Sequence, residues 1–176
     1  MKLAVVLHDI RSVHNVGSIF RTADGAGAEK IWLCGITPAP VDRFRNVRPD
    51  FAKVALGAEK FVPWAVEKDT AAAVAALKSD GYEIVALEQS PQSVPYYGAF
   101  ADDGPRKGEW KVALVLGAEV DGIPAGLLAL ADRIIEIPMY GGKESLNVSV
   151  AFGIAAFALR RQGEVGYNES VKDGTQ

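Results

Sequence analysis

The chain has 176 residues, of which 49% are hydrophobic and 23% charged, and its net charge is −3 at pH 7. This composition excludes a disordered chain, and the length suits one domain. No apolar stretch is long enough to span a membrane, and the single cysteine, Cys34, excludes an intrachain disulfide, so we expect a soluble cytoplasmic protein without a membrane partner.

Short apolar runs alternate with helical patterns along the chain. In chain order, we predict strands at 3–7, 30–33, 61–64, 83–87, 112–116 and 133–137, and helices at 15–25, 70–79, 124–130 and 147–161. This alternation predicts an α/β fold with a mainly parallel sheet and helices on both faces. We assign residues 1–162 to the domain and the polar residues 163–176 to a flexible C-terminal tail.

The first helix carries a cap and one apolar stripe. Asn15 is placed to accept a hydrogen bond from the early backbone amides. The buried stripe follows at positions i, i+3, i+4 and i+7: Val16, Ile19, Phe20 and Ala23. Arg21 falls on the opposite side, where it faces either a ligand or water.

The last helix has two apolar stripes. One contains Val148, Ala151, Phe152, Ala155 and Leu159, and the other contains Val150, Ile154 and Phe157. A helix that is apolar on two sides requires two partners. The sheet is one, and the second is a neighbouring helix or, as we favour, a second subunit in a homodimer.

Three polar segments lie where predicted strands end. Residues 14–21 read HNVGSIFR, residues 116–124 read LGAEVDGIP, and residues 137–149 read IPMYGGKESLNVS. Because ligands of open α/β sheets bind outside the carboxyl ends of the strands, these segments predict one pocket. Each segment also has a simpler interpretation: Ser145 or Asn147 caps a helix, and Glu119 is solvated. His8 and His14 have no third ligand at a suitable spacing, so we predict no metal site.

Together and in this order, the segments closely resemble the SpoU/TrmH-like RNA ribose 2′-O-methyltransferases of the SPOUT superfamily. They match the family's N-x-G-x-x-x-R, G-x-E-x-x-G and I-P-M-x-G-x-x-x-S-L-N-V-S motifs, and the resemblance spans about residues 3–161. One departure is Ala118, where many relatives carry asparagine. The resemblance implies a C-terminal trefoil knot, a homodimer and S-adenosylmethionine as cofactor; the sequence pattern itself shows no knot.

The resemblance also assigns residues to roles. Those expected to contact the cofactor are Leu87, Gly117, Ile137, Met139, Ser145 and Leu146. The expected catalytic residues are Arg21, Asn15, Glu119, Ser145 and Asn147, and Arg21 is the residue assigned to the ribose hydroxyl. A guanidinium rarely gives up its proton, so Arg21 is better suited to binding a phosphate and the developing oxyanion than to acting as a base. Expected RNA contacts are Arg43, Arg45, Arg48 and Lys143.

The resemblance therefore predicts transfer of a methyl group to a ribose 2′-hydroxyl of RNA. Transfer RNA is the preferred substrate and ribosomal RNA the alternative. Two other interpretations stay open: a non-catalytic relative that binds RNA, and a methyltransferase of the same superfamily that modifies bases. The acidic net charge gives no independent support for RNA binding, although the arginines at 43, 45 and 48 are close enough to form a local basic patch.

Overall fold

The sheet contains seven strands among the residues that the structure describes. The computed structural model describes residues 1–101, 103 and 108–172, with side chains described as far as residue 163. The strands are β1 Lys2–His8, β2 Lys30–Cys34, β3 Trp64–Glu67, β4 Glu83–Leu87, β5 Val94–Pro95, β6 Lys111–Leu116 and β7 Arg133–Glu136. Their order is β3-β2-β1-β6-β4-β7-β5, and each pair of neighbours is parallel. The predicted parallel α/β fold is confirmed.

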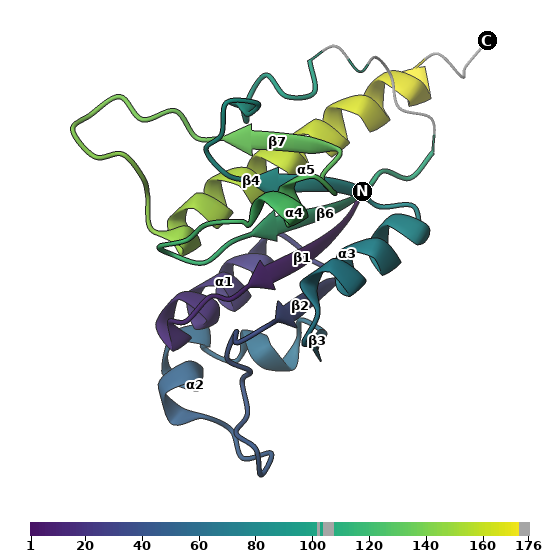
Figure 1. The fold of residues 1–176 in the computed structure, drawn as a ribbon. Coiled ribbons are helices and arrows are strands. Elements are labelled where there is room, and N and C mark those ends of the chain that lie inside the picture. The colour runs from purple at the N-terminus through teal and green to yellow at the C-terminus, as the bar shows by residue number, and fades with distance from the viewer. Residues whose placement is uncertain (102, 104–107, 173–176) are drawn as a thin grey trace.

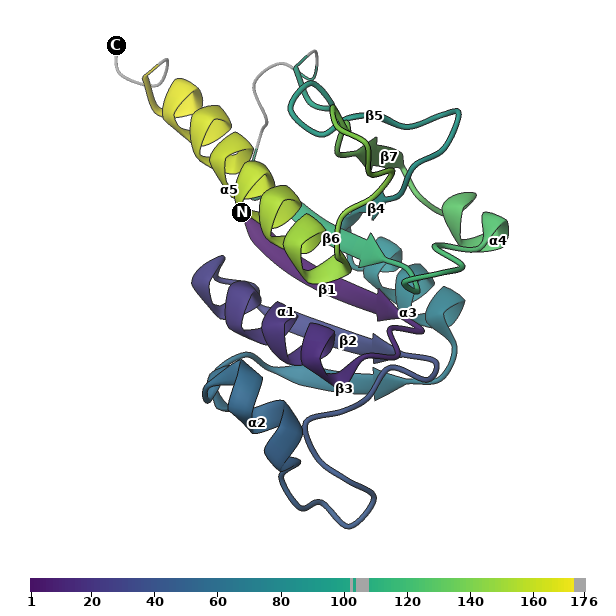
Figure 2. The ribbon, with the colours of Figure 1, turned by 90° about the vertical axis from the view of Figure 1, so that its left-hand side faces the viewer.

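Helices cover both faces of the sheet, as predicted (Figures 1 and 2). They are α1 Val13–Gly25, α2 Pro49–Ala55, α3 Thr70–Ser79, α4 Ala125–Leu128 and α5 Val148–Lys172, with a short 3-10 helix at Ala58–Lys60. Helices α1, α2 and α5 lie on one face, and α3 and α4 on the other. None of the described helices is both long and apolar enough to cross a membrane.

Strand β1, which lies between β2 and β6, divides its side chains between two cores. Leu3, Val5 and Leu7 are fully buried in the core shared with α1 and α5. Ala4 and Val6 point to the other face and pack in the core shared with α3. Side chains alternate along a strand, so a strand covered on both faces must be continuously apolar. This burial fixes the carboxyl ends of β1 and β6, from which the first two polar segments emerge.

Two local predictions are wrong. Helix α1 begins at Val13, and its cap is Ser12, whose Oγ accepts a hydrogen bond from the Asn15 amide at 3.2 Å. The side chain of Asn15 is thereby available for other partners. Strand β3 begins at Trp64 instead of 61, because Pro63 lacks an N–H for the ladder and Phe61 is 74% exposed. Helix α2, with its early Pro49, was not predicted.

Helix α5 is longer than predicted. It extends to Lys172, beyond the expected end at 161, and residues 173–176 of the predicted tail lie outside the described residues. Near its middle, Arg160 donates hydrogen bonds to the carbonyls of Met1, Ala26 and Gly27. These bonds tie α5 to the end of α1 and to the start of β1. The C-terminal trefoil knot stays a prediction.

Candidate active site

A pocket of about 610 Å³ opens at the carboxyl edge of the sheet. Its walls come from the ends of β4, β6 and β7, and from the segment 137–147 that connects β7 to α5. All six residues predicted to contact the cofactor line it: Leu87, Gly117, Ile137, Met139, Ser145 and Leu146. The pocket exists because the sheet places β4 between β6 and β7, so the loops that follow these strands face one another.

The pocket is acidic. Its lining includes five acidic residues, Glu88, Glu119, Asp121, Glu136 and Glu144, and no lysine or arginine among the described lining residues, although Arg11 pairs with Asp121 from outside the lining. Grouped carboxylates create a negative potential that attracts cations and repels phosphates. The pocket therefore favours a small ligand with a positive charge and disfavours a nucleotide bound through its phosphates.

Glu119 stands at one edge of the pocket and is held by four donors. Its carboxylate accepts hydrogen bonds from the Asn15 side chain at 3.0 Å and from the backbone amides of Arg11 and Ser12 at 3.2 and 3.3 Å. Partial burial acts to raise the pKa of Glu119, but these hydrogen bonds and one from its own backbone amide outweigh it and lower the pKa. The carboxylate is therefore ionised at neutral pH and fixed against the start of α1.

Asn15 and Asn147 extend this network across the pocket edge. Asn147 Nδ2 donates to Asn15 Oδ1 at 3.1 Å, and Asn147 Oδ1 accepts from the amide and hydroxyl of Ser149 at 2.9 and 2.6 Å. Each amide side chain thus has one orientation, since reversing it would place donor against donor. The chain Glu119–Asn15–Asn147 joins all three motifs through residues more than a hundred positions apart.

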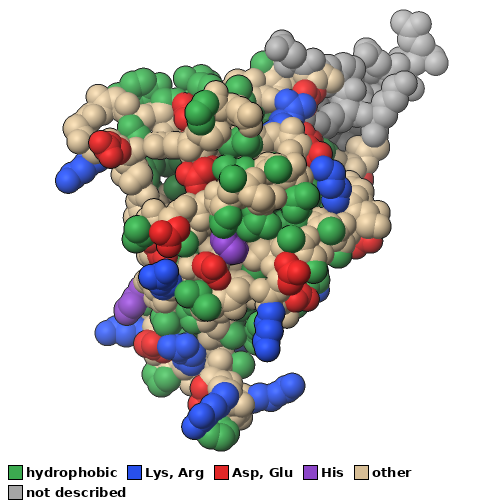
Figure 3. All heavy atoms as spheres, viewed as in Figure 1, with side chains coloured by type: hydrophobic (Ala, Val, Ile, Leu, Met, Phe, Trp, Pro, Cys, Tyr) green, Lys and Arg blue, Asp and Glu red, His purple; other side chains and the backbone are tan. Residues whose placement is uncertain are grey.

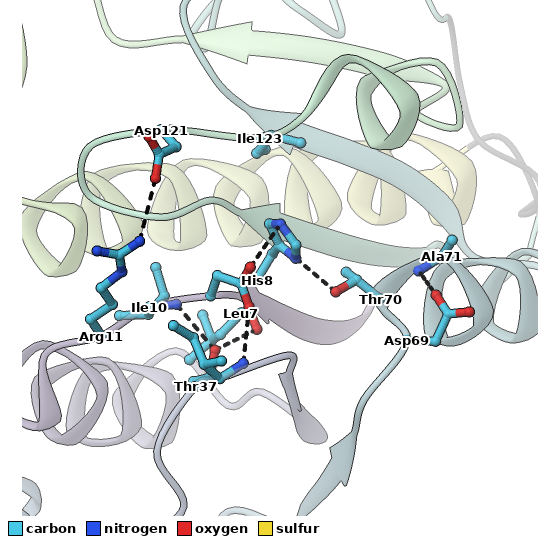
Figure 4. A network of polar contacts seen from close by, with 12 residues as sticks. Leu7, His8, Ile10, Arg11, Thr37, Asp69, Thr70, Ala71, Asp121 and Ile123 are labelled. Atoms are coloured by element: carbon cyan, nitrogen blue, oxygen red, sulfur yellow. Dashed lines mark hydrogen bonds and ion pairs between the residues drawn. The ribbon is translucent and has the colours of Figure 1, made fainter.

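The segment 137–147 forms a strap over the pocket. In Figures 1 and 3 it stands away from the body of the molecule before it enters α5. The side chain of Gln89 donates to the carbonyl of Glu144 at 2.7 Å and secures the strap from the β4 side. On the β6 side, Arg11 pairs at 3.6 Å with Asp121, which belongs to the loop that follows the strand (Figure 4).

Glu88 organises the floor of the pocket, a role that was not predicted for it. One carboxylate oxygen accepts from the Ile123 amide at 2.8 Å and the other from the Gln89 amide at 2.9 Å. It thereby fixes the loop from Gly117 to Gly122 against the end of β4. A signal was present in the sequence, because Glu88 is an acidic residue that directly follows the apolar run predicted as the strand at 83–87.

The remaining predicted residues lie apart from this network. Arg21 is exposed on α1, does not line the pocket of its own chain and makes no hydrogen bond or ion pair with another described residue. Arg43, Arg45 and Lys143 are exposed. Arg48 pairs with Asp50 at 3.3 Å at the start of α2, so only part of its charge is available to a ligand.

The histidines take other positions. His8 Nδ1 lies 2.7 Å from the hydroxyl of Thr70 and its Nε2 lies 3.5 Å from Asp9, so the ring bridges β1 and α3 (Figure 4). His14 is exposed. Among the described residues, no three histidine, cysteine or acidic side chains are grouped as metal ligands.

The fold and the pocket together define an α/β domain that binds a small ligand at the carboxyl ends of parallel strands. The chain belongs to the SpoU rRNA methylase family, whose model matches residues 2–157. The resemblance read from the three motifs is thereby confirmed.

Curated relatives act on two kinds of RNA according to their names. The chain is 34% identical over 163 residues to a 23S rRNA (guanosine-2′-O-)-methyltransferase of Ralstonia nicotianae, covering 93% of this chain and 60% of that protein. It is 33% identical over 160 residues to a tRNA (guanosine(18)-2′-O)-methyltransferase of Escherichia coli, covering 91% and 63%. The chain thus spans about 60% of the length of these relatives.

Solved structures share the fold. An AdoMet-bound rRNA methyltransferase from Sinorhizobium meliloti superposes with a TM-score of 0.77 at 29% identity, covering 92% of this chain and 56% of that one. The TrmH/SpoU tRNA modifying enzyme of A. aeolicus superposes with a TM-score of 0.75 at 25% identity, covering 99% and 90%.

Proposed function

We propose that this protein transfers a methyl group from S-adenosylmethionine to a ribose 2′-hydroxyl of RNA. The observation that carries the proposal is that the second and third motifs line one acidic pocket, while the first motif joins the edge of that pocket through the chain Glu119–Asn15–Asn147. Relatives with 2′-O-methyltransferase names, at 30 to 34% identity, support the reaction.

The pocket suits S-adenosylmethionine. Its volume of about 610 Å³ lies within the range of roughly 300–1,000 Å³ typical of small-molecule sites. Leu87, Ile137, Met139 and Leu146 supply apolar walls for an adenine ring, and the carboxylates of the lining complement a positively charged sulfur. When bound, S-adenosylmethionine supplies a methyl group made electrophilic by that sulfur.

The residues of the chain then have distinct tasks. Asn15 and Asn147, oriented by Glu119 and Ser149, position the ribose at the pocket edge. Ser145, exposed and without a hydrogen bond to another described residue, is available to the ribose or its phosphate. A guanidinium keeps its proton at neutral pH, so Arg21 binds the neighbouring phosphate and stabilises the developing oxyanion. Holding the ribose hydroxyl in line with the methyl group lowers the activation barrier of the transfer through orientation, and the charge of Arg21 lowers it electrostatically.

The proposal includes a homodimer. On α5, Val150 and Phe157 are 51% and 52% exposed, although Phe152, Ala155 and Leu159 of the other stripe are buried. Thr22 of α1, next to Arg21, lies against Gly153 of α5. An interface over α1 and α5 would cover the exposed stripe and bring Arg21 to the subunit boundary, where a site could be completed by both chains.

Transfer RNA is the substrate we favour, with ribosomal RNA as the alternative, since relatives of both kinds match. Arg43, Arg45 and Lys143 would contact phosphates, with a smaller part for Arg48. Because both RNAs are cytoplasmic molecules, we place the activity in the cytoplasm.

The test is transfer of labelled methyl from S-adenosylmethionine to unmodified tRNA and rRNA transcripts, followed by nuclease digestion and nucleoside analysis. We expect a labelled 2′-O-methylnucleoside. Arg21→Ala should reduce transfer by at least about a hundredfold, as for loss of one stabilising donor, and leave affinity for S-adenosylmethionine within about twofold. Lys60→Ala, which removes an exposed charge on the 3-10 helix, is the control and should retain activity.

Three results would contradict the proposal. A labelled base identifies a base methyltransferase, and the absence of label from every RNA indicates a non-catalytic relative. A fully active Arg21→Ala variant removes the role assigned to the arginine.

A further inference from the structure

A short turn projects from the carboxyl edge of the sheet between β2 and α2. Val41 and Val47 pair across it in an antiparallel bridge. Inside the turn, Asp42 accepts hydrogen bonds from the amides of Phe44 and Asn46 at 2.8 and 2.9 Å and from the Asn46 side chain at 3.2 Å. The turn is therefore held in shape by its own residues and needs no support from the core.

The chain that leads from β2 into this turn is also held in place, through Thr37. The buried hydroxyl of Thr37 donates to the carbonyl of Leu7 at 3.0 Å and accepts from the amide of Ile10 at 3.1 Å (Figure 4). Leu7 and Ile10 belong to β1 and to the loop that leads into α1. The turn is thus fixed relative to the strand that lies between β2 and the pocket strand β6.

The tip displays an aromatic ring between two arginines. Phe44 is 69% exposed, and the Arg43 guanidinium lies 4.7 Å from the centre of the Phe44 ring. Arg45, the next residue in the chain after Phe44, is also exposed. Figure 3 shows basic and hydrophobic side chains at the lowest point of the molecule, where Figure 1 places this turn. A ring held in water by a self-supporting turn contributes little to folding, so its exposure requires another explanation.

The chemistry of the tip matches unpaired nucleic acid. Bases of single strands stack on aromatic rings, and arginines beside the ring contact the flanking phosphates. The one acidic residue of the turn, Asp42, keeps its negative charge, since the hydrogen bonds given above lower its pKa, but Arg43 and Arg45 leave the turn with a net positive charge. Bases inside a duplex are already stacked and offer no free face to the ring.

We propose that residues 41–47 form an RNA-binding finger in which Phe44 stacks on an unpaired base of the substrate while Arg43 and Arg45 hold adjacent phosphates. This inference rests on the proposed function and extends it, because it makes a loop or single-stranded end the element recognised beyond the pocket. The finger emerges at the same sheet edge as the pocket, so one RNA can reach both (Figure 2).

The test measures binding of the full chain to a fluorescent unmodified tRNA transcript. Phe44→Ala should weaken binding roughly 5- to 150-fold, the range for loss of one stacked base. Phe44→Trp should restore it, whereas Phe44→Leu, which is apolar without a ring, should not. The matched control is Phe61→Ala, since Phe61 is 74% exposed but precedes β3 and therefore lies at the opposite edge. Affinity for S-adenosylmethionine should stay constant throughout.

A second measurement separates stacking from charge. Phe44→Ala should weaken binding of a short oligouridine and leave binding of a duplex RNA of equal length unchanged. An equal loss of affinity for the oligouridine and for the duplex, or a change of oligomeric mass in Phe44→Ala, would contradict the RNA-binding role of the finger. If the wild type methylates RNA and Phe44→Ala binds it equally well, the finger is wrong and the proposed function stands. If the wild type neither binds nor methylates RNA, both the finger and the proposed function are wrong.

Discussion

The carboxylate of Glu119 connects the start of α1 with the loop after β6. Its four hydrogen-bond donors come from the side chain of Asn15 and from three backbone amides. The first motif therefore contributes to the site chiefly by binding the second. Asn15, which had been expected to cap α1, is available for this because Ser12 takes the capping position.

This arrangement predicts a pH-dependent contribution to stability. The pKa of Glu119 is lowered in the folded state, so its stabilisation is complete above the unfolded-state pKa of about 4.3 and is lost as the pH falls through the folded-state value. Glu119→Gln should lower the melting temperature at about pH 7 by roughly 1 to 3 °C, and this difference should shrink below about pH 4. Circular dichroism melts at several pH values measure it.

Glu144→Gln is the control, because the side chain of Glu144 is exposed and its carboxylate makes no hydrogen bond with another described residue. It should leave the melting temperature unchanged across the same range. A deficit of Glu119→Gln that stayed constant down to about pH 3 would show that the ionised carboxylate is not the stabilising species.

At the scale of elements, the loop after β6 is compact because two glycines allow it. A Cβ on Gly117 would lie 2.3 Å from the carbonyl carbon of Gly122 and 2.5 Å from the amide nitrogen of Ile123. Gly122 itself has a φ of +65° and lies against the carboxylate of Glu88. No side chain can be added at Gly117 without moving backbone that forms the pocket floor.

Gly117→Ala should therefore open this loop. We expect a loss of about 1 to 3 kcal/mol in the free energy of unfolding and a decrease of roughly tenfold or more in affinity for S-adenosylmethionine. Chemical denaturation and titration calorimetry measure the two. Gly126→Ala in α4 is the matched control, since a Cβ there meets nothing within 4 Å and should stabilise the helix by up to about 1 kcal/mol. If both variants behave alike, the close approach does not constrain the site.

At the scale of the molecule, α5 links the pocket to the proposed dimer interface. It begins at the strap and packs on α1 through one stripe, and it leaves Val150 and Phe157 half exposed on another. Exposed apolar stripes on a long helix mark interaction surfaces. The same helix contributes to the pocket at its start and, in the proposed dimer, would contribute to subunit contact along its length.

Phe157→Asp is expected to convert a dimer to a monomer, because burying a charge without a partner costs several kcal/mol. Sedimentation equilibrium should give about half the wild-type mass, with an unchanged far-ultraviolet spectrum showing that the chain still folds. Phe61→Asp, at an exposed position outside this stripe, should keep the wild-type mass. A wild type that is monomeric at micromolar concentration would refute the interface.

Much of the site was predictable because its signals are local. The residues that the family resemblance assigns to the cofactor all line one pocket, at the carboxyl ends of strands whose apolar patterns are clear in the sequence. Predictions failed where competing local signals existed, as at Ser12 and Asn15, or where a proline displaced a strand, as at Pro63. Glu88 was not assigned a role because its partners, the amides of Gln89 and Ile123, are backbone groups without a sequence signature.

The sequence by itself determined the alternation of strands and helices, the buried stripe of α1 and the three motifs, because strand and helix periodicities depend on neighbours a few positions apart. Only the tertiary structure decided that β4 lies between β6 and β7, that Glu119, Asn15 and Asn147 form one chain, and that Arg21 lies outside the pocket of its own subunit. These features depend on strand order and on contacts between residues more than a hundred positions apart, which local patterns do not encode.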